Sequence, residues 1–359
     1  MTNDIRGSVH ALVLYDVSEE ISLDDLRGIV GTRTVGPSFK HPAPQYVRFQ
    51  RPPVVESLDP VVLETGERLE GQVKYYDYGV ISLMFEVPFT GDWGALIRAS
   101  DRWISGAELE RHALSIARAK VERASSALVK PYAEWLNEDY YVFHVRDLQG
   151  APAASDLLKQ CRAQIAQIVR GETVSLSEDE QREVLQASIS YYPTDLAVFG
   201  WNAAFVYDTP AGAETTIQIL EYANSQLLEF RHYDELLTRE LAGVYRSLDR
   251  GTGTIQRWRL ARSATKLQTT ALDVTELVER ADNAIKFLSD MFAARLYRLA
   301  ASKVGVHDYK DLVNQKLRTA DELYRFMVEQ FNQGRAFVLE LMVVIILVIE
   351  LFYFFWGKV

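Results

Sequence analysis

The C-terminal end of the chain constrains its fold more than any other feature. Residues 336–356 read AFVLELMVVIILVIELFYFFW, in which Glu340 and Glu350 are the charged positions. At about 1.5 Å per residue, a helix of this length spans roughly 30 Å, the thickness of a bilayer core. The sequence therefore predicts a transmembrane helix over 336–356, with a long buried core helix as the alternative. Because almost the whole chain precedes this segment, we expect a tail-anchored protein.

The N-terminus bears on where the rest of the chain resides. It begins MTNDIRGSVH, which has neither the charged and then apolar layout of a signal peptide nor the Arg- and Ser-rich character of a transit peptide. We therefore expect the bulk of the chain to stay in the compartment where it is made, on the cytoplasmic side of the membrane. The single cysteine, Cys161, excludes an intramolecular disulfide and agrees with a reducing compartment.

The two glutamates are unusual in so apolar a stretch. Glu340 lies near the edge of the predicted span, where it can reach the interface or pair with Arg335. Glu350 lies deeper, where a charged side chain costs at least roughly 2.5 to 3.5 kcal/mol on insertion scales. The pair lies about 80° apart around a helix, so both can face one partner. We predict that they form a membrane contact between copies of the chain. Protonation, snorkelling and a different membrane partner remain alternatives.

The segment before the predicted span has the periodicity of long helices. From Gly212 onward there is no proline, and apolar residues recur at steps of three and four. This spacing is typical of a coiled coil, and glycine-containing breaks at 249–253 and 303–308 divide it into three runs. We predict a stalk of antiparallel helices over 211–335, whose seams face either one another or a second subunit. The most regular seam includes Leu267, Val274, Val278, Ile285, Leu288 and Phe292.

Residues 1–210 have a different character, with β-rich runs alternating with helical patterns. Strands are expected at 8–17, 71–89, 139–148 and 188–209, and helices at 22–30, 106–136 and 155–171. The hydrophobic content of 48% is enough for a substantial core. We therefore predict an α+β protein with an N-terminal mixed α/β head. The order strand, helix, long strand occurs twice, so a pseudo-duplicated head is one interpretation.

Three segments together resemble a known family. FVLELMVVIILVIELF has Leu339 before its first glutamate, and LYRLAASKVGVHDYKDLVNQKL contains Asn314 and Leu317. YYDYGVISLMFEVP contains Tyr78, Gly79 and Val80. In these positions the chain resembles the "required for meiotic nuclear division" family. The resemblance covers residues 290–356 and, more thinly, 71–88.

The resemblance implies a divergent bacterial member that is membrane-anchored and homo-oligomeric. The chain departs from the family at Leu341, where a tryptophan is usual, and it lacks a Phe-Trp element between head and helical hairpin.

No pattern in the sequence indicates catalysis. The six histidines, His10, His41, His112, His144, His232 and His307, have no spacing typical of metal ligands, and each is interpreted as an ordinary surface or packing residue. There is no phosphate-binding Gly-Lys-Ser/Thr loop and no Gly-x-Ser-x-Gly elbow. We therefore predict no catalytic residue, no cofactor and no metal. A net charge of -10 argues against nucleic acid as a partner.

Together these features predict a non-enzymatic, tail-anchored membrane scaffold. It is expected to self-associate through its stalk and transmembrane helices and to hold an unidentified cytoplasmic protein at the lipid bilayer. The alternative is an oligomeric ion-conducting protein, with Glu340 and Glu350 lining its pore.

Overall fold

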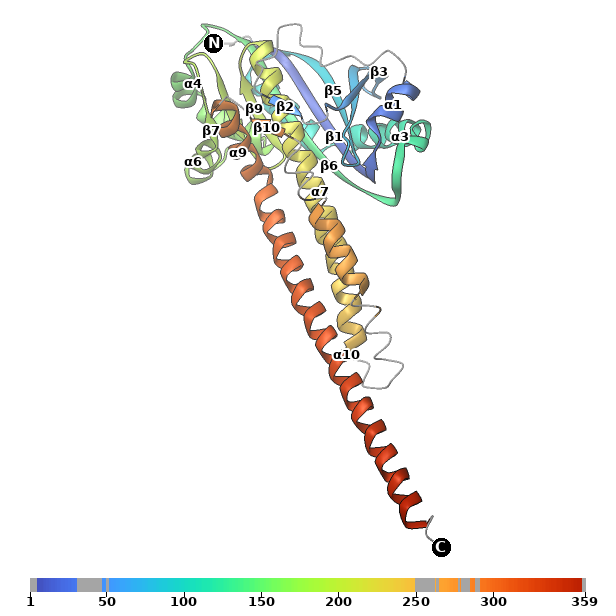
Figure 1. Cartoon of the computed structure of the whole chain (residues 1–359). Helices are drawn as coiled ribbons and strands as arrows, with labels where there is room; N and C mark the ends of the chain where they lie inside the picture. The colour runs from blue at the N-terminus through green and yellow to red at the C-terminus, as the bar shows by residue number, and fades with distance from the viewer. Residues whose placement is uncertain are drawn as a thin grey trace. The chain divides into compact units, whose positions relative to one another are not determined.

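The computed structural model describes residues 5–30, 47–49, 52–248, 262, 265–276, 278, 285–287 and 291–356 (Figure 1). The chain divides into two compact units. The first unit comprises Met1–His232 and Glu279–Lys310, and the second comprises Tyr233–Val278 and Asp311–Val359. Helices α7 (Pro210–Leu248) and α10 (Val306–Trp356) each contribute residues to both units.

The first unit is built on a mixed sheet. Across the described residues its eight strands follow the order β3-β4-β5-β1-β6-β9-β8-β7. Neighbouring strands are antiparallel, except that β6 and β9 run parallel. The strand bounds are β1 Ile5–Ile21, β3 Val54–Val62, β4 Arg68–Tyr75, β5 Val80–Gly91, β6 Leu128–Leu148, β7 Ser188–Ile189, β8 Leu196–Phe199 and β9 Ala203–Tyr207. A separate antiparallel pair joins β2 (Val47–Phe49) to β10 (Ile285–Phe287).

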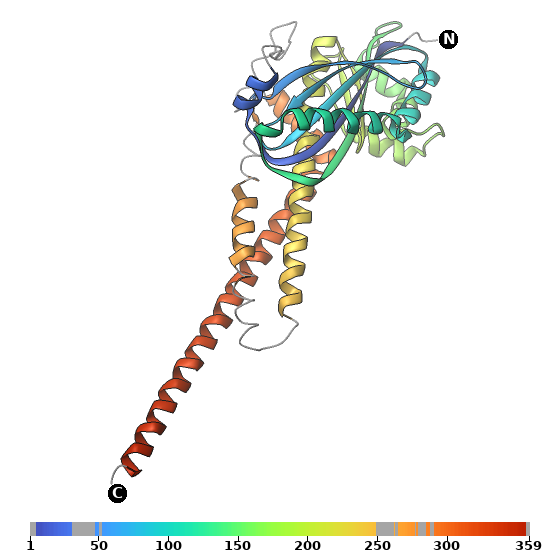
Figure 2. The ribbon, with the colours of Figure 1, turned by 90° about the vertical axis from the view of Figure 1, so that its right-hand side faces the viewer.

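One face of the sheet is apolar and carries the main core. Because side chains alternate along a strand, Val9 and Val13 of β1 enter this core, whereas Ser8 and His10 point to the opposite face. Figure 2 shows α3 lying across the strands. Helices on the apolar side contribute buried residues such as Leu96 and Ala113.

The helices that precede α7 are short. Their bounds are α1 Leu23–Val30, α2 Trp93–Ser105, α3 Glu108–Arg123, η1 Ser125–Ala127, α4 Ala154–Gln160, α5 Arg162–Arg170 and α6 Glu178–Gln186. Helix α2 begins where the Asp92 carboxylate accepts a hydrogen bond from the Ala95 amide at 2.7 Å. Helix α5 ends at Gly171, whose φ of +67° favours glycine.

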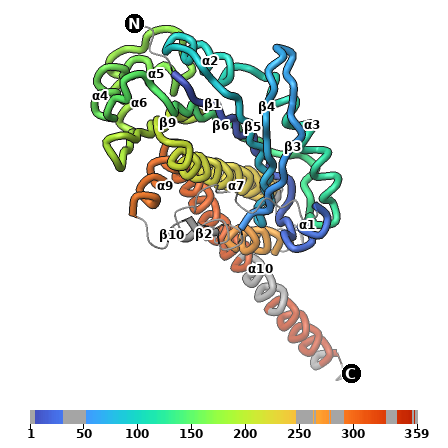
Figure 3. Tube along the Cα trace, turned by 90° about the horizontal axis from the view of Figure 1, so that it is seen from above, coloured from blue at the N-terminus to red at the C-terminus, as the bar shows by residue number. Residues whose placement is uncertain are grey.

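The opposite face of the sheet packs against the first part of α7, with α9 (Met291–Val304) beside that helix (Figure 3). The contacts here combine apolar side chains, such as Leu12 and Leu220, with polar ones. Tyr78 donates a 2.7 Å hydrogen bond to Ser225, which in turn donates to the Tyr222 carbonyl. Gly79 has a φ of +97°, and a Cβ atom there would lie 1.7 Å from the Ser18 carbonyl oxygen, so no larger residue fits. Val80 begins β5 and is fully buried.

The second unit has a small apolar cluster of its own. Leu241, Val244, Leu267, Ala320 and Met327 pack together from α7, the helical residues 265–276 and α10. Lys316 donates to the Asp234 carboxylate at 2.5 Å, so the polar residue in an apolar position of the α7 pattern is paired.

The predicted stalk seam is not one continuous helix. Leu267, Val274 and Val278 are helical and buried. Ile285, however, lies in strand β10. Leu288 falls outside the described residues, and Phe292 belongs to α9, where its ring lies 4.9 Å from that of Tyr191. The heptad spacing predicted a helix through residues 285–287. These residues instead form a strand, because their backbone pairs with β2.

The predicted fold class is wrong in its C-terminal element. Across the described residues, no helix combines the length and the apolar character needed to cross a membrane. Residues 306–356 form one helix, α10, and its uninterrupted apolar run between Glu340 and Glu350 is about 14 Å long, roughly half a bilayer core. The predictions of a tail anchor, a membrane scaffold, a Glu-lined pore and a membrane location are therefore not supported.

The pseudo-duplicated head is also wrong. The first predicted copy pairs its outer strands, β1 and β5, antiparallel, whereas the second pairs β6 and β9 parallel. A repeated order of elements therefore does not correspond to a repeated topology. The chain is a mixed α/β protein built on a single larger sheet.

Candidate functional site

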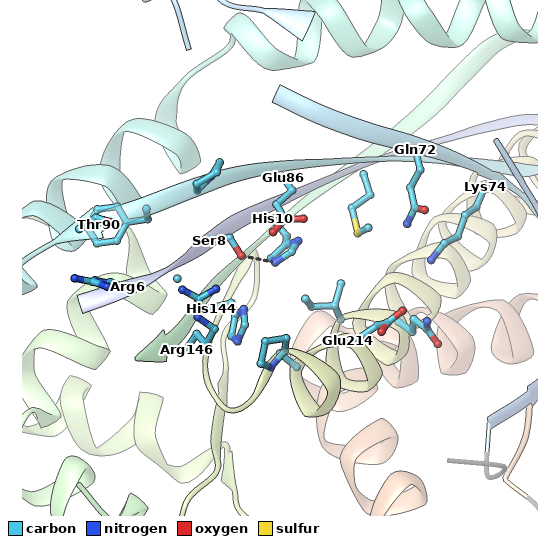
Figure 4. A pocket seen from close by; sticks show the side chains of 18 residues that line it. Arg6, Ser8, His10, Gln72, Lys74, Glu86, Thr90, His144, Arg146 and Glu214 are labelled. Carbon is cyan, nitrogen blue, oxygen red and sulfur yellow. Dashed lines mark hydrogen bonds between the residues drawn. The ribbon is translucent and has the colours of Figure 1, made fainter. Parts of the chain in front are cut away.

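A cavity of about 450 Å³ lies between the polar face of the sheet and the start of α7 (Figure 4). Four strands and one helix supply its walls. The lining residues are Arg6, Gly7, Ser8 and His10 from β1, Gln72 and Lys74 from β4, Met84, Glu86, Pro88, Phe89 and Thr90 from β5, His144 and Arg146 from β6, and Pro210, Ala213, Glu214, Ile217 and Gln218 from α7.

Strand register brings the polar lining residues together. Ser8 lies opposite His144 on β6, and His10 lies opposite Glu86 on β5. Directly opposed residues share a face of the sheet, so these side chains gather over the middle of the cavity floor. Figure 4 shows Ser8, His10 and His144 between Arg6 at one end and Lys74 at the other.

A β-bulge shapes the end of the cavity near Arg6. On β6, Asp147 pairs with Arg6 and Val145 pairs with Gly7, which leaves Arg146 as the extra residue. An extra residue re-aims the side chains beside it, and here Arg146 lines the same cavity as Arg6. A Cβ atom on Gly7 would lie 1.8 Å from the His144 carbonyl oxygen, so the bulge requires glycine at this position.

His10 is the most unusual side chain in the cavity. It is 7% exposed, and its Nε2 atom shares a 2.9 Å hydrogen bond with the Ser8 hydroxyl. Burial, followed by the charge of His144, lowers its pKa to about 3, so the imidazole is neutral near pH 7. In a neutral imidazole one nitrogen donates and the other accepts. The second nitrogen, Nδ1, is buried and has no hydrogen-bond partner within the described part of the chain.

His144 fixes the beginning of α7. Its Nε2 atom donates a 3.0 Å hydrogen bond to the Asp208 carbonyl oxygen, which can only accept. Burial lowers the His144 pKa, so this ring too is neutral at pH 7. The two imidazole centroids lie 6.1 Å apart. His144 therefore joins strand β6 to the segment that leads into the helix.

The first turn of α7 is capped by its own neighbours. The Thr209 hydroxyl accepts from the Gly212 amide at 3.3 Å, and the Thr209 carbonyl accepts from the Ala213 amide at 2.9 Å. Pro210 has no amide hydrogen. Few amide donors of this helix therefore remain free to bind a ligand. What the helix start contributes to the cavity is the positive end of its dipole. Gly212 is needed here, because a Cβ atom would lie 2.0 Å from an Asp208 carboxylate oxygen.

A buried ion pair closes the other end of the cavity. Lys74 donates to Oε2 of Glu221 at 2.5 Å, and Glu221 is completely buried. Its second oxygen, Oε1, has no hydrogen-bond partner within the described residues. The pair keeps a cationic side chain at the cavity wall without leaving the carboxylate uncompensated.

The lining of the cavity is mixed in charge. Arg6, Lys74 and Arg146 line it together with Glu86 and Glu214, and Lys74 is already paired with Glu221 and Arg146 with Asp147. Two of the cationic side chains, Arg6 and Arg146, lie at the same end, and this end suits a negatively charged group. The guanidinium groups present planar, paired donors to an oxyanion. No group of three or more potential metal ligands is found in the described regions of the chain.

None of the site residues predicted from sequence lines this cavity. Glu340 and Glu350 are exposed on α10, and Asn314 and Leu317 are half-buried on the same helix. The side chain of Leu339 lies outside the part of the chain that the structure describes. The proposed role of the two glutamates inside a membrane is lost with the span, while their contact with other copies of the chain stays a prediction.

His10 and His144 were predicted to be ordinary surface or packing residues, although the sequence around them contains a signal of a polar strand face. In IRGSVHALVL, polar side chains at Arg6, Ser8 and His10 occupy alternate positions of a strand whose other positions are small or apolar. The run FHVRD repeats this alternation at His144 and Arg146. Such alternation is typical of a strand with one polar face, and the burial of that face in the structure makes it a cavity wall.

The first unit is thus a mixed α/β domain, with a polar cavity under one long helix. Residues 6–214 match the family described as "Uncharacterized protein MJ0711, N-terminal domain", and the chain belongs to this family. The matched region begins at Arg6 and ends at Glu214, so it holds every cavity residue on the sheet and the first turn of α7. The predicted membership of the "required for meiotic nuclear division" family is therefore wrong.

One relative is the "Uncharacterized protein MJ0711" of Methanocaldococcus jannaschii. It is 18% identical to this chain over 230 residues, which cover 64% of this chain and 70% of the relative. No solved structure matches the chain. The short apolar segments that carried the earlier resemblance lie mostly in α10, beyond the matched region.

Proposed function

We propose that the first unit is a binding domain for a small anionic ligand, which occupies the cavity under the start of α7. The observation that carries this proposal is His10, a buried residue of the cavity lining whose Nδ1 atom has no hydrogen-bond partner among the described residues. An unpaired buried polar atom costs about 1–3 kcal/mol. A ligand atom that bonds to Nδ1 removes that cost.

The charge of the ligand follows from what surrounds His10. When Ser8 donates its hydroxyl proton to Nε2, the neutral ring carries its own proton on Nδ1 and becomes a donor. Donors on Arg6 and Arg146 and the positive end of α7 face the same cavity. Glu86 and Glu214 supply acceptors elsewhere in the lining, so the donors near Arg6 favour an oxyanion at that end of the cavity (Figure 4).

The site favours binding over catalysis. Ser8 and His10 resemble a nucleophile and base in distance, at 2.9 Å. In such pairs a third group usually orients the base through its other nitrogen, and Nδ1 of His10 has none within the described residues. A pKa near 3 also makes His10 a weak base. The expectation that the protein is not an enzyme thus remains our proposal.

The test is calorimetric titration of the full chain with inorganic phosphate, sugar phosphates and dicarboxylates. We expect at least one anion to bind the wild type. In His10→Gln, the side-chain amide takes the place of Nε2 and keeps the contact with Ser8. No atom of the glutamine replaces Nδ1. It should weaken binding about tenfold or more, since a buried hydrogen bond of this kind is worth about 1–3 kcal/mol.

Two further variants make the test specific. His10→Asn places an amide near Nδ1 and should retain more affinity than His10→Gln. His112→Gln, on α3 and outside the cavity, is the matched control and should bind as the wild type does. Failure of every anion to bind, or unchanged affinity in His10→Gln, would overturn the proposal.

A further inference from the structure

The geometry points to a more specific ligand, a mononucleotide, held with its phosphate between Arg6 and Arg146 and its base near Gln72 and Gln218. This inference rests on the proposed anion site and adds the identity of the group attached to the anion. It is carried by the length of the cavity, the chemistry of its two ends and its volume.

The cavity is elongated along the strands. Arg6 pairs with Thr90 at one end, whereas Gln72 pairs with Met84, which lies opposite Leu12, at the other. Six residues of β1 separate these two levels, which is about 20 Å of strand. Figure 4 shows Arg6 and Thr90 at one end and Gln72 and Lys74 at the other. A bare oxyanion would occupy one end only.

The end near Arg6 has the chemistry of a phosphate site. The bulge on β6 adds Arg146 to the side of the cavity that already holds Arg6. Arg146 already donates from Nε to Asp147 at 2.8 Å, so its remaining N–H groups, together with those of Arg6, are the donors for phosphate oxygens. His10 lines the cavity between the two ends.

The opposite end has the chemistry of a base site. Gln72 and Gln218 each offer a side-chain amide, which carries both a donor and an acceptor, as the hydrogen-bonding edge of a nucleobase does. Met84 and Ile217 line the cavity from the sheet and from α7. Their apolar side chains suit the faces of a planar ring, and Met adapts well to such surfaces.

An alkyl carboxylate fits this end poorly. A hydrocarbon tail placed against Gln72 and Lys74 would remove polar groups from water without replacing their hydrogen bonds. The volume of about 450 Å³ also lies within the range of cavities that enclose whole small ligands, about 300–1,000 Å³. A mononucleotide uses both polar ends and the apolar middle.

The experiment is calorimetric titration of the full chain with AMP, GMP, CMP and UMP, and in parallel with ribose 5-phosphate, inorganic phosphate and the four nucleosides. We expect at least one mononucleotide to bind tenfold or more tightly than both ribose 5-phosphate and its own nucleoside. Arg146→Gln should weaken nucleotide and ribose 5-phosphate alike.

Variants at the base end separate this inference from the proposed function. Gln72→Leu and Gln218→Leu should weaken nucleotide binding about fivefold or more while leaving ribose 5-phosphate unchanged. Gln160→Leu, at an exposed position of α4 outside the cavity, is the matched control. Equal affinity for ribose 5-phosphate and all nucleotides would overturn the nucleotide assignment and leave the anion site standing. If no phosphorylated compound and no other anion binds, both fail.

Discussion

The two faces of the sheet use alternate residues of the same strands, yet they differ in what they bury. On the face covered by α2, α3 and α5, β1 and β6 supply Val9, Val13 and Phe143 to an apolar core. On the face covered by α7, apolar residues of these strands such as Leu12 and Val142 are joined by buried polar residues, which are Ser8, His10, Lys74 and Glu221. Apolar burial stabilises the fold by about 1.5–3 kcal/mol for each large side chain. Buried polar groups contribute little to the stability of the fold, because the cost of removing them from water offsets their hydrogen bonds.

The difference indicates separate roles for the two faces. The first face holds an apolar core that stabilises the fold, whereas the second face adds buried polar groups to its apolar residues. Polar groups retained on the second face cost stability unless they are paired, and Nδ1 of His10 and Oε1 of Glu221 have no hydrogen-bond partner within the described residues. Departures from local packing rules concentrate at functional sites. The α7 face is therefore where ligand binding is to be sought.

The largest expected effect comes from the apolar face. Phe205 is fully buried on β9, and its ring stacks on that of Trp93 at 6.0 Å. Phe205→Ala should lower the free energy of unfolding by about 3–5 kcal/mol, because it leaves a cavity. Urea unfolding followed by tryptophan fluorescence measures this. Ligand affinity of the folded variant should not change, since Phe205 does not line the cavity. A loss below about 1 kcal/mol would contradict the assignment of this face as the stabilising one.

The next effect tests the buried ion pair on the α7 face. Lys74→Met leaves the Glu221 carboxylate buried without its partner and should cost about 3 kcal/mol in urea unfolding. The double variant Lys74→Met with Glu221→Leu should recover most of that loss. Arg102→Met is the control, because its pair with Glu67 is partly exposed and should be worth less than about 1 kcal/mol. A double variant as unstable as the single one would show that the pair itself stabilises the fold.

The smallest effect is a pH dependence that belongs to the α7 face. The pKa of His10 falls from 6.5 to about 3 on folding, mainly through burial. The unfolded state therefore binds a proton below pH 6.5 that the folded state does not, and stability decreases as the pH falls from 6.5 towards 3. His10 contributes up to about 1.4 kcal/mol for each pH unit in this window.

The comparison of wild type with His10→Gln isolates that contribution. Between pH 7 and pH 5.5 the wild type should lose about 1 kcal/mol more than the variant in urea unfolding. Other carboxyl and histidine groups, including His144, titrate in both proteins and cancel to first order. Identical pH slopes would mean that His10 is hydrated or charged in the folded protein.

Local periodicity predicted some elements and misled on others. The alternation in SVHALVLYDV predicted a strand, and residues 5–21 form β1. The heptad positions Leu267 and Val274 are helical and buried. The same spacing failed at Ile285, because strand pairing with β2 is a long-range contact that heptad spacing does not encode. The membrane span was predicted from the total length of residues 336–356, although Glu340 and Glu350 divide the apolar run into shorter pieces.

The mixed α/β character of the first unit could be predicted from local patterns, because alternation and helical spacing are properties of neighbouring residues. The site could not, because it depends on contacts between distant segments. His10 and His144 come from strands far apart in sequence, and their proximity depends on the register between β1 and β6 and on the bulge at Arg146. Register is set by the packing of whole strands, and a shift of one residue would turn every side chain to the other face. The cavity therefore exists only once the sheet is assembled and α7 lies across it.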